Sequence, residues 1–271
     1  MTRRFCFLLL ATVLLLLPAA SFPQSAPAPI NQVRIPPPPP NASPQQLEQR
    51  GDELRAEKAY FDARDYYAAA LKKSPVADRH HAAELYNKIG IVELEAQNFG
   101  IATKAFKRSI KLDKLYAEPY NNLGATFYLL KKPKAAIKQY GKALKLNDQN
   151  ASFHANLGTA YLTRKQFDLM NVEFARAVEL DPNIFEHRSN TGSALQLRSP
   201  LERARFDYAL AKVYAKYGNA DLSLRYLRMA MEDGYQPIGD VYKDAAFVRI
   251  RKDPRFTALM ASPPVAIRGH Q

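Results

Sequence analysis

Between His81 and Pro182 the chain reads LYNKIGIV at residues 85–92, PYNNLGAT at residues 119–126 and FHANLGTA at residues 153–160. The glycines of these segments recur at intervals of 34 residues, as Gly90, Gly124 and Gly158. Three further columns follow each glycine at constant distances and hold Ala102, Ala136 and Met170, then Phe106, Tyr140 and Phe174, then Ser109, Ala143 and Ala177. Each copy has two apolar stripes of helical period separated by a short polar break, which predicts a helix–turn–helix.

The repeated glycine indicates how the two helices of a copy meet. The glycine and the residue twelve positions later are expected where the helices cross, because only small side chains let two backbones approach closely. We expect the aromatic residue sixteen positions after each glycine to fill the gap toward the next pair. A single pair cannot bury both of its apolar faces, so the copies must stack. The stretch therefore predicts a solenoid.

A fourth copy lies upstream and carries the same columns in Leu47, Gly51, Leu54, Ala63, Tyr67, Ala70 and the closing Pro75. It stands 39 residues before the next copy, so about five residues near positions 76–80 enlarge the loop between them. The columns resemble the tetratricopeptide repeat family, whose pattern places aromatic residues, Leu-Gly, Ala and Pro along 34 positions. This resemblance implies an all-α protein, a right-handed α-solenoid of stacked helix–turn–helix repeats with a C-terminal capping segment.

The sequence departs from the family pattern at several positions. It contains no Trp, Met170 replaces a small residue, and Lys114 and Asp148 replace the closing Pro. Glu93 occupies a column that is normally aromatic, and the pattern gives no reason for it unless its helix is rotated outward. We interpret the other departures as local repacking.

The first 21 residues predict a signal peptide. Arg3 and Arg4 precede an apolar run from Phe5 to Leu17, and small residues at 19–21 offer a cleavage site. An uncleaved anchor is the alternative, although so short a run spans a bilayer poorly. The one cysteine, Cys6, lies inside this run, so the cleaved chain would carry no disulfide and no thiol chemistry. Its net charge would fall from +13 to +11, because two arginines leave and no acidic residue does.

Residues 22–44 are rich in proline and predict a disordered linker. Within them, Pro36–Pro40 is expected to be extended polyproline II. Two uses remain open: a tether that keeps the repeats clear of the exported end, and a ligand for a proline-reading domain. The leader and the tail favour an exported protein of a bacterial envelope, either periplasmic or secreted.

The solenoid is expected over residues 45–261, with repeats at about 44–77, 83–116, 117–150, 151–184 and 203–236. The register after Pro182 is open between two frames. In one frame Gly192 continues the glycine column, and Ala204, Tyr208 and Ala211 continue the later columns. In the other frame residues 206–217 form a first helix, Gly218-Asn219 the turn and residues 222–232 a second helix. We prefer the latter because Gly-Asn is a turn signal, which leaves residues 183–200 as an irregular connector.

The last part of the body predicts a cap over residues 237–261. Phe247, Ile250, Phe256 and Leu259 are expected to cover the last exposed face, because an end repeat needs a cover that is polar outside. Residues 262–271 are expected to form a flexible tail.

We expect no enzyme activity, because the chain lacks a catalytic constellation. It has no H-E-x-x-H motif, no glycine-rich phosphate loop and no Gly-x-Ser-x-Gly motif. His80 and His81 have no second ligand pair at a suitable spacing, so no metal and no cofactor are predicted. His154 stands in an aromatic column and is expected to pack at the edge of the core.

A concave groove lined by the first helix of each pair is the leading candidate for partner binding. Lys88, Asn122 and Asn156 stand two positions before successive repeat glycines and are predicted to point into it. Amide side chains can bond the backbone of an extended peptide without reading its sequence, and groove-binding members of the resembled family use such asparagines. A role in helix packing is the alternative. Glu48 and Asp52 stand where the family's carboxylate-binding members have Lys and Asn, so that activity is not expected.

The second candidate is a basic stripe on the convex side. It comprises Lys104, Lys107, Arg108 and Lys111 in one repeat and Lys134, Lys138, Lys142 and Lys145 in the next. Such a face could bind an anionic membrane or wall polymer, and a merely solvated helix surface is the alternative. No nucleic-acid partner is expected, because no aromatic residues project among the lysines.

Two functional hypotheses follow. The first is a non-enzymatic exported scaffold that binds a peptide or protein partner in the groove, in envelope assembly. The second is an envelope adaptor that adsorbs to anionic lipid or wall polymer through the basic convex face. Salt separates them, because adsorption through lysines weakens steeply with ionic strength.

Overall fold

The computed structural model describes residues 36–186, 199–235 and 238–264. The predicted signal peptide, residues 22–35 of the predicted linker and most of the predicted tail lie outside these ranges. Within them the chain is all-α and has no β-strand. The α-helices are α1 (Pro44–Ala56), α2 (Tyr60–Lys73), α3 (Arg79–Glu95), α4 (Phe99–Leu112), α5 (Glu118–Leu129), α6 (Pro133–Leu146), α7 (Ala151–Thr163), α8 (Phe167–Leu180), α9 (Pro200–Lys216), α10 (Ala220–Glu232) and α11 (Pro254–Ala261), and two 3₁₀ helices are η1 (Ile238–Tyr242) and η2 (Ala245–Phe247).

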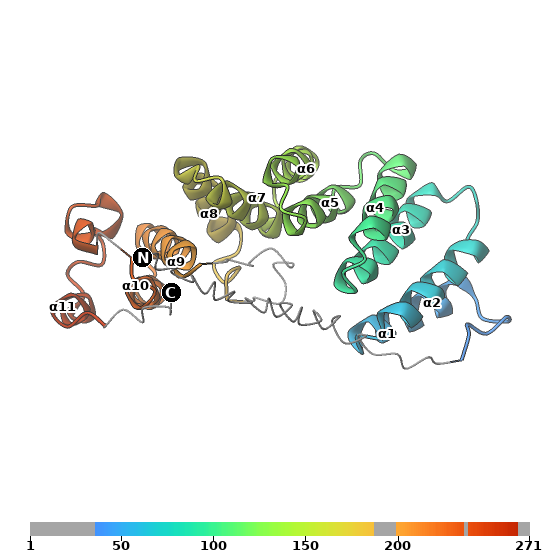
Figure 1. Ribbon diagram of the computed structural model, residues 1–271, viewed down its shortest axis with the longest axis horizontal. Helices are drawn as coiled ribbons and strands as arrows, with labels where there is room; N and C mark the ends of the chain where they lie inside the picture. Colours follow the sequence, from blue (N-terminus) through green and yellow to red (C-terminus); the bar gives the residue numbers. More distant parts are fainter. Residues whose placement is uncertain (1–35, 187–198, 236–237, 265–271) are drawn as a thin grey trace, which may run out of the picture.

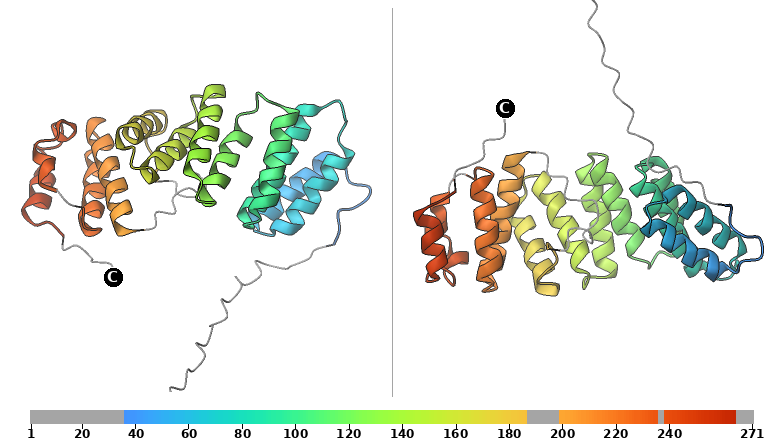
Figure 2. Two further views of the ribbon diagram at one scale, coloured as in Figure 1. Left: turned by 45° about the horizontal axis from the view of Figure 1, so that its top comes forward. Right: turned by 90° about the horizontal axis from the view of Figure 1, so that it is seen from below.

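Consecutive helices from α1 to α10 form five pairs that stack side by side into an elongated solenoid (Figure 1, Figure 2). We call the odd-numbered member of each pair the first helix and the even-numbered member the second helix. Each second helix packs against the first helix of the next pair, and the first helices α3, α5, α7 and α9 also contact one another in turn. The first helices therefore line one face, the inner face, and the second helices line the outer face. None of the helices in the described ranges is long and apolar enough to cross a membrane.

The turns inside the pairs share one backbone conformation. A residue with positive φ stands seven positions after the column glycine in each of the first four pairs, as Lys58, Gln97, Lys131 and Lys165, with φ from 58° to 62°. Gly218, with φ 78°, takes this place in the pair of α9 and α10. Glycine adopts this conformation at little cost, whereas the other four turns accept a side chain there.

The column glycines set the distance between the two helices of a pair. A Cβ atom at Gly124 would lie 2.6 Å from two ring carbons of Tyr140, and Gly51 has the same relation to Tyr67. Phe106 and Phe174 cover Gly90 and Gly158 in the same way. The aromatic ring therefore packs on the glycine of its own pair, which corrects the expectation that it fills the gap toward the next pair. The ring takes this position because the missing side chain leaves room for it.

The fifth pair keeps the columns but changes their residues. Counting back seven positions from Gly218 places Ala211 in the glycine column, and Leu227 then stands in the aromatic column sixteen positions later. Both side chains are fully buried, and the Ser223 hydroxyl, in the small-residue column, donates to the Ala211 carbonyl at 2.7 Å. A methyl group and a smaller apolar side chain thus replace the glycine and the ring together. Gly192, on which the other frame depends, lies outside the described residues.

Aromatic side chains fill the junction between the fourth and fifth pairs. Phe185, just after α8, packs edge-on against Phe174 and Phe206, with ring centroids 5.1 and 5.8 Å away. The Tyr214 hydroxyl of α9 donates to the Pro182 carbonyl at 3.1 Å. At the other end of the array, the predicted cap residues Phe247, Ile250, Phe256 and Leu259 are all buried in one cluster with α9 and α10.

Glu93, which the repeat pattern left without a reason, is only 1% exposed. Its carboxylate accepts a hydrogen bond from the Asn98 amide at 2.8 Å and lies 3.4 Å from the Arg64 guanidinium of the preceding pair. A buried carboxylate is tolerated when hydrogen bonds and an opposite charge satisfy it. Glu93 therefore replaces an apolar contact with a polar tie, and its helix is not rotated outward.

Candidate functional site

Polar contacts join neighbouring first helices along the inner face at one repeated pair of columns. The residue two positions before each glycine bonds the residue three positions before the preceding column glycine. The contacts are Lys88 Nζ to Glu48 Oε1 at 2.8 Å, Asn122 Nδ2 to Asn87 Oδ1 at 2.9 Å and Asn156 Nδ2 to Asn121 Oδ1 at 3.0 Å. These contacts form the rungs of a ladder that runs from α1 to α7.

The amides of the ladder are connected to one another. Asn121 Nδ2 donates to Asn122 Oδ1 at 3.3 Å, and Asn87 Nδ2 donates to the Tyr116 hydroxyl at 3.2 Å. A continuous chain of hydrogen bonds therefore links α3, α5 and α7. Buried amides need such partners, because an unsatisfied polar group in the interior is costly.

A second row of contacts lies about two turns further along the same helices. Arg55 Nη2 of α1 lies 3.0 Å from Glu95 Oε1 of α3, and the Tyr128 hydroxyl of α5 lies 3.0 Å from the Thr163 hydroxyl of α7. These contacts use the columns four and five positions after the glycine. The inner face is thus bounded by two rows of inter-repeat contacts.

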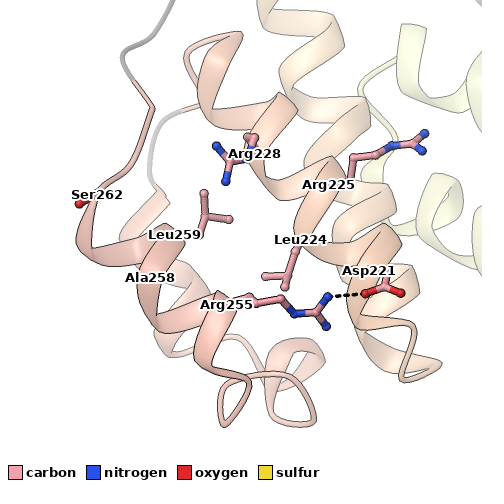
Figure 3. A pocket seen from close by; sticks show the side chains of 8 residues that line it. All are labelled: Asp221, Leu224, Arg225, Arg228, Arg255, Ala258, Leu259 and Ser262. Carbon is pink, nitrogen blue, oxygen red and sulfur yellow. Dashed lines mark hydrogen bonds and ion pairs between the residues drawn. The ribbon is translucent and has the colours of Figure 1, made fainter.

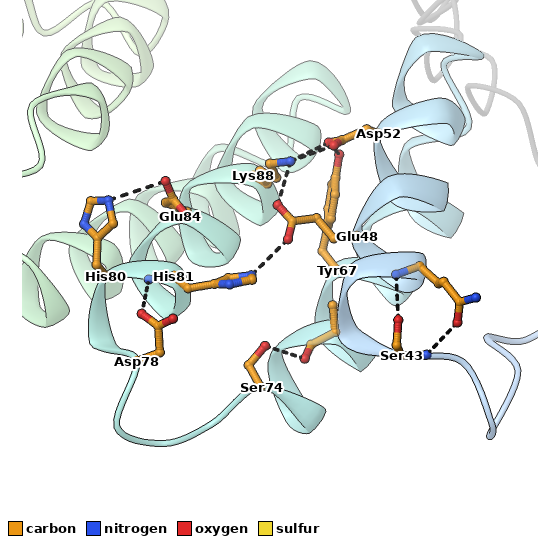
Figure 4. A network of polar contacts seen from close by, with 12 residues as sticks. Ser43, Glu48, Asp52, Tyr67, Ser74, Asp78, His80, His81, Glu84 and Lys88 are labelled. Atoms are coloured by element: carbon orange, nitrogen blue, oxygen red, sulfur yellow. Dashed lines mark hydrogen bonds and ion pairs between the residues drawn. The ribbon is translucent and has the colours of Figure 1, made fainter.

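The ladder begins in a charged network between α1, α2 and α3 (Figure 4). Lys88 lies between two carboxylates, with Nζ 2.8 Å from Glu48 and 2.7 Å from Asp52. The Tyr67 hydroxyl donates to Asp52 at 2.8 Å, and His81 Nε2 lies 2.9 Å from Glu48. Burial alone would lower the pKa of Lys88, but the bonds to Asp52 and Glu48 outweigh it and raise that pKa. Lys88 therefore stays charged and holds two acids on the inner face.

The three residues predicted to line the groove differ in their exposure. Lys88 and Asn122 are half-buried, so part of each side chain remains open on the inner face. Asn156 is only 3% exposed, which corrects the expectation that it points into a groove: its amide lies between α5 and α7 and orders their packing. Ala125 and Thr159, one position after the glycines of α5 and α7, are small and buried as well.

Asn122 keeps hydrogen-bonding capacity for a ligand. A primary amide has two N–H donors and two acceptor lone pairs. The bonds to Asn87 and Asn121 use one donor and one lone pair, so one of each remains. The sequence analysis did not predict Asn87 and Asn121. Their signal is that the column three positions before the glycine is also polar in the first three pairs, directly before the column of Lys88 and Asn122.

The histidines serve as local ties. His80 Nδ1 lies 2.6 Å from Asp113, whereas His81 faces Glu48 on another helix, so the adjacent pair does not converge on one point. His154 Nδ1 lies 2.6 Å from Glu173, and its Nε2 lies 3.0 Å from the Asp148 carbonyl. Within the described ranges no group of three or more His, Cys, Asp or Glu side chains is placed to hold a metal ion.

The predicted basic residues of the convex side lie on α4 and α6, and all of them are exposed: Lys104, Lys107, Arg108, Lys111, Lys134, Lys138, Lys142 and Lys145. None of them pairs with a carboxylate in the part of the chain that the structure describes. Arg108 and Lys142 instead lie over the rings of Tyr86 and Tyr120, at 5.9 and 5.6 Å. The basic face ends at α8, where Val172 takes the column of Lys104 and Lys138.

A hollow of about 650 Å³ lies between α10 and α11 (Figure 3). Leu224 and Leu259 form its apolar wall, and three arginines stand around it. Arg255 is paired with Asp221 at 2.5 Å, and Arg225 is paired with Glu186 at 2.6 Å. Because neighbouring acids already neutralise two of the three guanidinium groups, the hollow offers less free charge than the outer face of α4 and α6.

Comparison with known proteins supports the repeat assignment. A family model described as TPR repeat matches residues 127–163, which span the end of α5, all of α6 and α7. The search of curated proteins gave no match.

Similar solved structures include a crystal structure of MamA, with 22% identity, 68% of this chain and 93% of that chain covered, and a TM-score of 0.46. A crystal structure of YrrB, described as a TPR protein with an unusual peptide-binding site, is 19% identical over 73% of this chain and 90% of that chain, with a TM-score of 0.45. TTC0263, a thermophilic TPR protein in Thermus thermophilus, is 18% identical over 80% of this chain and 100% of that chain, with a TM-score of 0.48. The family match identifies a tetratricopeptide repeat at residues 127–163, and the neighbouring helix pairs carry the same glycine and aromatic columns.

Proposed function

We propose that the protein is a non-enzymatic scaffold that binds an extended segment of a peptide or partner protein along the inner face of α1, α3 and α5. The observation that carries this proposal is Asn122, a half-buried amide on that face that keeps a free donor and a free acceptor. An extended backbone presents the complementary pair of groups at each residue. Asn122 therefore suits recognition of backbone rather than of a particular side chain.

The charges near Asn122 favour a partner with basic side chains. The Asp52 and Glu84 side chains are 49% and 42% exposed, and both belong to first helices. Lys88 is shared between two acids and is itself half-buried, so it does not offset the carboxylates fully. A lysine or arginine of the bound segment would add a further positive partner to these partly exposed carboxylates, which already face Lys88 and His80. A peptide that passes from α5 to α1 would meet the amide first and the acids second.

We also propose that the scaffold acts after export, in envelope assembly. The support is the composition of the first 44 residues, with a basic start, an apolar run and a proline-rich stretch before the repeats. The same stretch would let the repeat body stand away from the exported end.

Binding to an array of short random peptides tests the inner face. We expect the bound peptides to be enriched in Lys and Arg, and Asn122→Ala to weaken binding roughly thirty-fold, because two hydrogen bonds of about 1 kcal/mol each are lost. Asn156→Ala is the matched control: it leaves Asn121 buried without its donor, so it should lower the melting temperature but not the affinity. Lys138→Glu with Lys142→Glu on the outer face should also leave the affinity unchanged.

The opposite pattern would contradict the proposal. If the outer-face variant abolishes peptide binding while Asn122→Ala keeps full affinity, the inner face is not the binding surface.

A further inference from the structure

Two apolar side chains are almost completely exposed at matching positions. Val76, in the loop between α2 and α3, is 98% exposed, and Leu115, in the loop between α4 and α5, is 79% exposed. Each stands 25 residues after its column glycine, Gly51 or Gly90. One exposed apolar residue needs no explanation, but two at the same place in neighbouring loops form a pattern.

The two loops are neighbours in space. His80, which follows the first loop, has Nδ1 at 2.6 Å from Asp113 of the second loop. Its ring also packs edge-on against Tyr116, with centroids 5.5 Å apart. Val76 and Leu115 therefore lie along one edge of the solenoid, where the second helices end and the chain passes to the next pair. Leu146, at the end of α6, continues this edge and is partly exposed.

Exposed lysines stand on both sides of the apolar residues. They are Lys72 and Lys73 at the end of α2, Lys111 at the end of α4, Lys114 in the following loop and Lys145 at the end of α6. None forms an ion pair in the residues that the structure describes, although Lys73 Nζ bonds the Pro40 and Ala42 carbonyls at 2.6 Å. We call Val76, Leu115 and these five lysines the basic edge.

The aspartates near the basic edge are engaged within their own loops. Asp78 accepts from the backbone N–H of His81 at 2.9 Å, and Asp113 accepts from that of Leu115 at 2.8 Å while it also faces His80. Asp148 accepts from the Gln149 amide at 2.9 Å. The five lysines of the basic edge outnumber these three aspartates, and none of the five is paired with them.

We propose that the basic edge docks on the surface of an anionic lipid bilayer, with Val76 and Leu115 entering the headgroup region and the lysines pairing with lipid phosphates. Apolar side chains flanked by lysines suit the boundary between acyl chains and headgroups. There the methylene groups of each lysine lie in the apolar layer, and its ammonium group reaches the phosphates. The exposed lysines of the outer face, on α4 and α6, strengthen the same attraction at longer range.

A bilayer fits the basic edge better than a soluble polyanion or a folded acidic partner does. A polyanion would neutralise the lysines but leave Val76 and Leu115 in water. A folded partner that covered Val76 and Leu115 would also cover the neighbouring lysines, although charged residues are depleted at the core of such interfaces. A deformable bilayer can receive each side chain separately. The basic edge is a different surface from the inner face, so lipid binding there does not depend on peptide binding.

Flotation with lipid vesicles tests the proposal. The chain without residues 1–21 is used, because the apolar run there would itself enter membranes; the buried apolar residues that the structure describes begin at Leu47, so the packed body is kept. We expect binding to vesicles with equal amounts of phosphatidylcholine and phosphatidylserine, and none to pure phosphatidylcholine. Lys111→Gln with Lys114→Gln should weaken binding by roughly five-fold for each charge removed. Val76→Ser with Leu115→Ser should weaken vesicle binding about four-fold for each methyl or methylene group that no longer enters the bilayer.

Matched controls test whether position matters. Val172→Ser removes another exposed apolar side chain, and Lys216→Gln with Lys243→Gln removes two exposed lysines elsewhere. Both should bind vesicles as the unaltered chain does. All variants should keep the unaltered circular dichroism spectrum, because every substituted side chain is exposed.

Three results would overturn the proposal. The first is the absence of binding to the phosphatidylserine vesicles. The second is full-strength binding by Val76→Ser with Leu115→Ser, which would reduce the edge to a charged surface without insertion. The third is soluble polyglutamate that binds as tightly as the vesicles and displaces them, which would point to an acidic polymer or protein instead.

Discussion

The ring of Tyr140 occupies the space that a side chain at Gly124 would need, and the ring is fully buried. Its hydroxyl group has no hydrogen-bond partner in the residues that the structure describes. The contact of the Tyr140 ring with Gly124 is therefore van der Waals packing, without a hydrogen bond from the hydroxyl group. Because a buried ring cannot swing aside into solvent, an added methyl group at Gly124 must push the two helices apart.

We expect Gly124→Ala to destabilise the protein by about 1–3 kcal/mol, the usual range for overpacking a buried site. Thermal unfolding followed by circular dichroism measures the effect. Gly141→Ala in α6 is the matched control, because nothing lies within 4 Å of a Cβ atom there. In that helical position alanine should stabilise the protein by roughly 0.5–1 kcal/mol relative to glycine.

The fifth pair suggests how the loss could be reversed. There Ala211 and Leu227 occupy the columns of Gly124 and Tyr140. We expect Tyr140→Leu to restore part of the stability that Gly124→Ala removes, since the smaller side chain makes room for the methyl group. A double variant no more stable than the sum of the two single changes predicts would show that the smaller side chain does not compensate for the added methyl group.

At the scale of the helical element, His154 ties α7 to α8 and to the loop before α7. Both of its ring nitrogens face acceptors, the Glu173 carboxylate and the Asp148 carbonyl. Only the protonated ring can donate to both. Burial alone would lower the pKa of His154, but these two bonds outweigh it and raise the pKa above its usual value of 6.5.

The raised pKa of His154 predicts a pH dependence of stability. A group whose pKa is higher in the folded than in the unfolded state contributes its full stabilisation at pH values below its pKa in the unfolded state. That stabilisation is lost as pH rises from about 6.5 through the folded pKa. We therefore expect the melting temperature to fall over this window. His154→Tyr places the residue of Tyr86 and Tyr120 in the column and should remove this part of the slope. An unchanged slope in that variant would assign the pH dependence to other groups.

At the scale of the whole molecule, the repeat columns predicted the helix pairs well because they report burial within one pair. Gly124, for example, is found from spacing alone, since its neighbour Tyr140 belongs to the same copy. Contacts between copies are harder to predict, because they depend on the offset between adjacent first helices. The Asn122–Asn87 bond is such a contact, and no single copy contains both partners.

The same limit explains why the candidate site was predicted only in part. Lys88 and Asn156 share one column, yet Lys88 is half-buried and Asn156 is buried. The difference lies in the partners of each residue: Lys88 reaches two partly exposed acids of α1, whereas Asn156 donates to the buried Asn121 of α5. The polar neighbours of Glu93 also come from another column and another pair, so the repeat pattern could not show them.

Hydrogen–deuterium exchange with a peptide selected from the array tests whether the inner face of α1, α3 and α5 holds the partner. We predict slower amide exchange in α1, α3 and α5 on peptide binding, and unchanged exchange in the outer helices α4 and α6. The Asn122→Ala variant should show weaker protection at the same peptide concentration. Protection confined to α4 and α6, with α3 and α5 unaffected, would show that the partner binds the outer face instead.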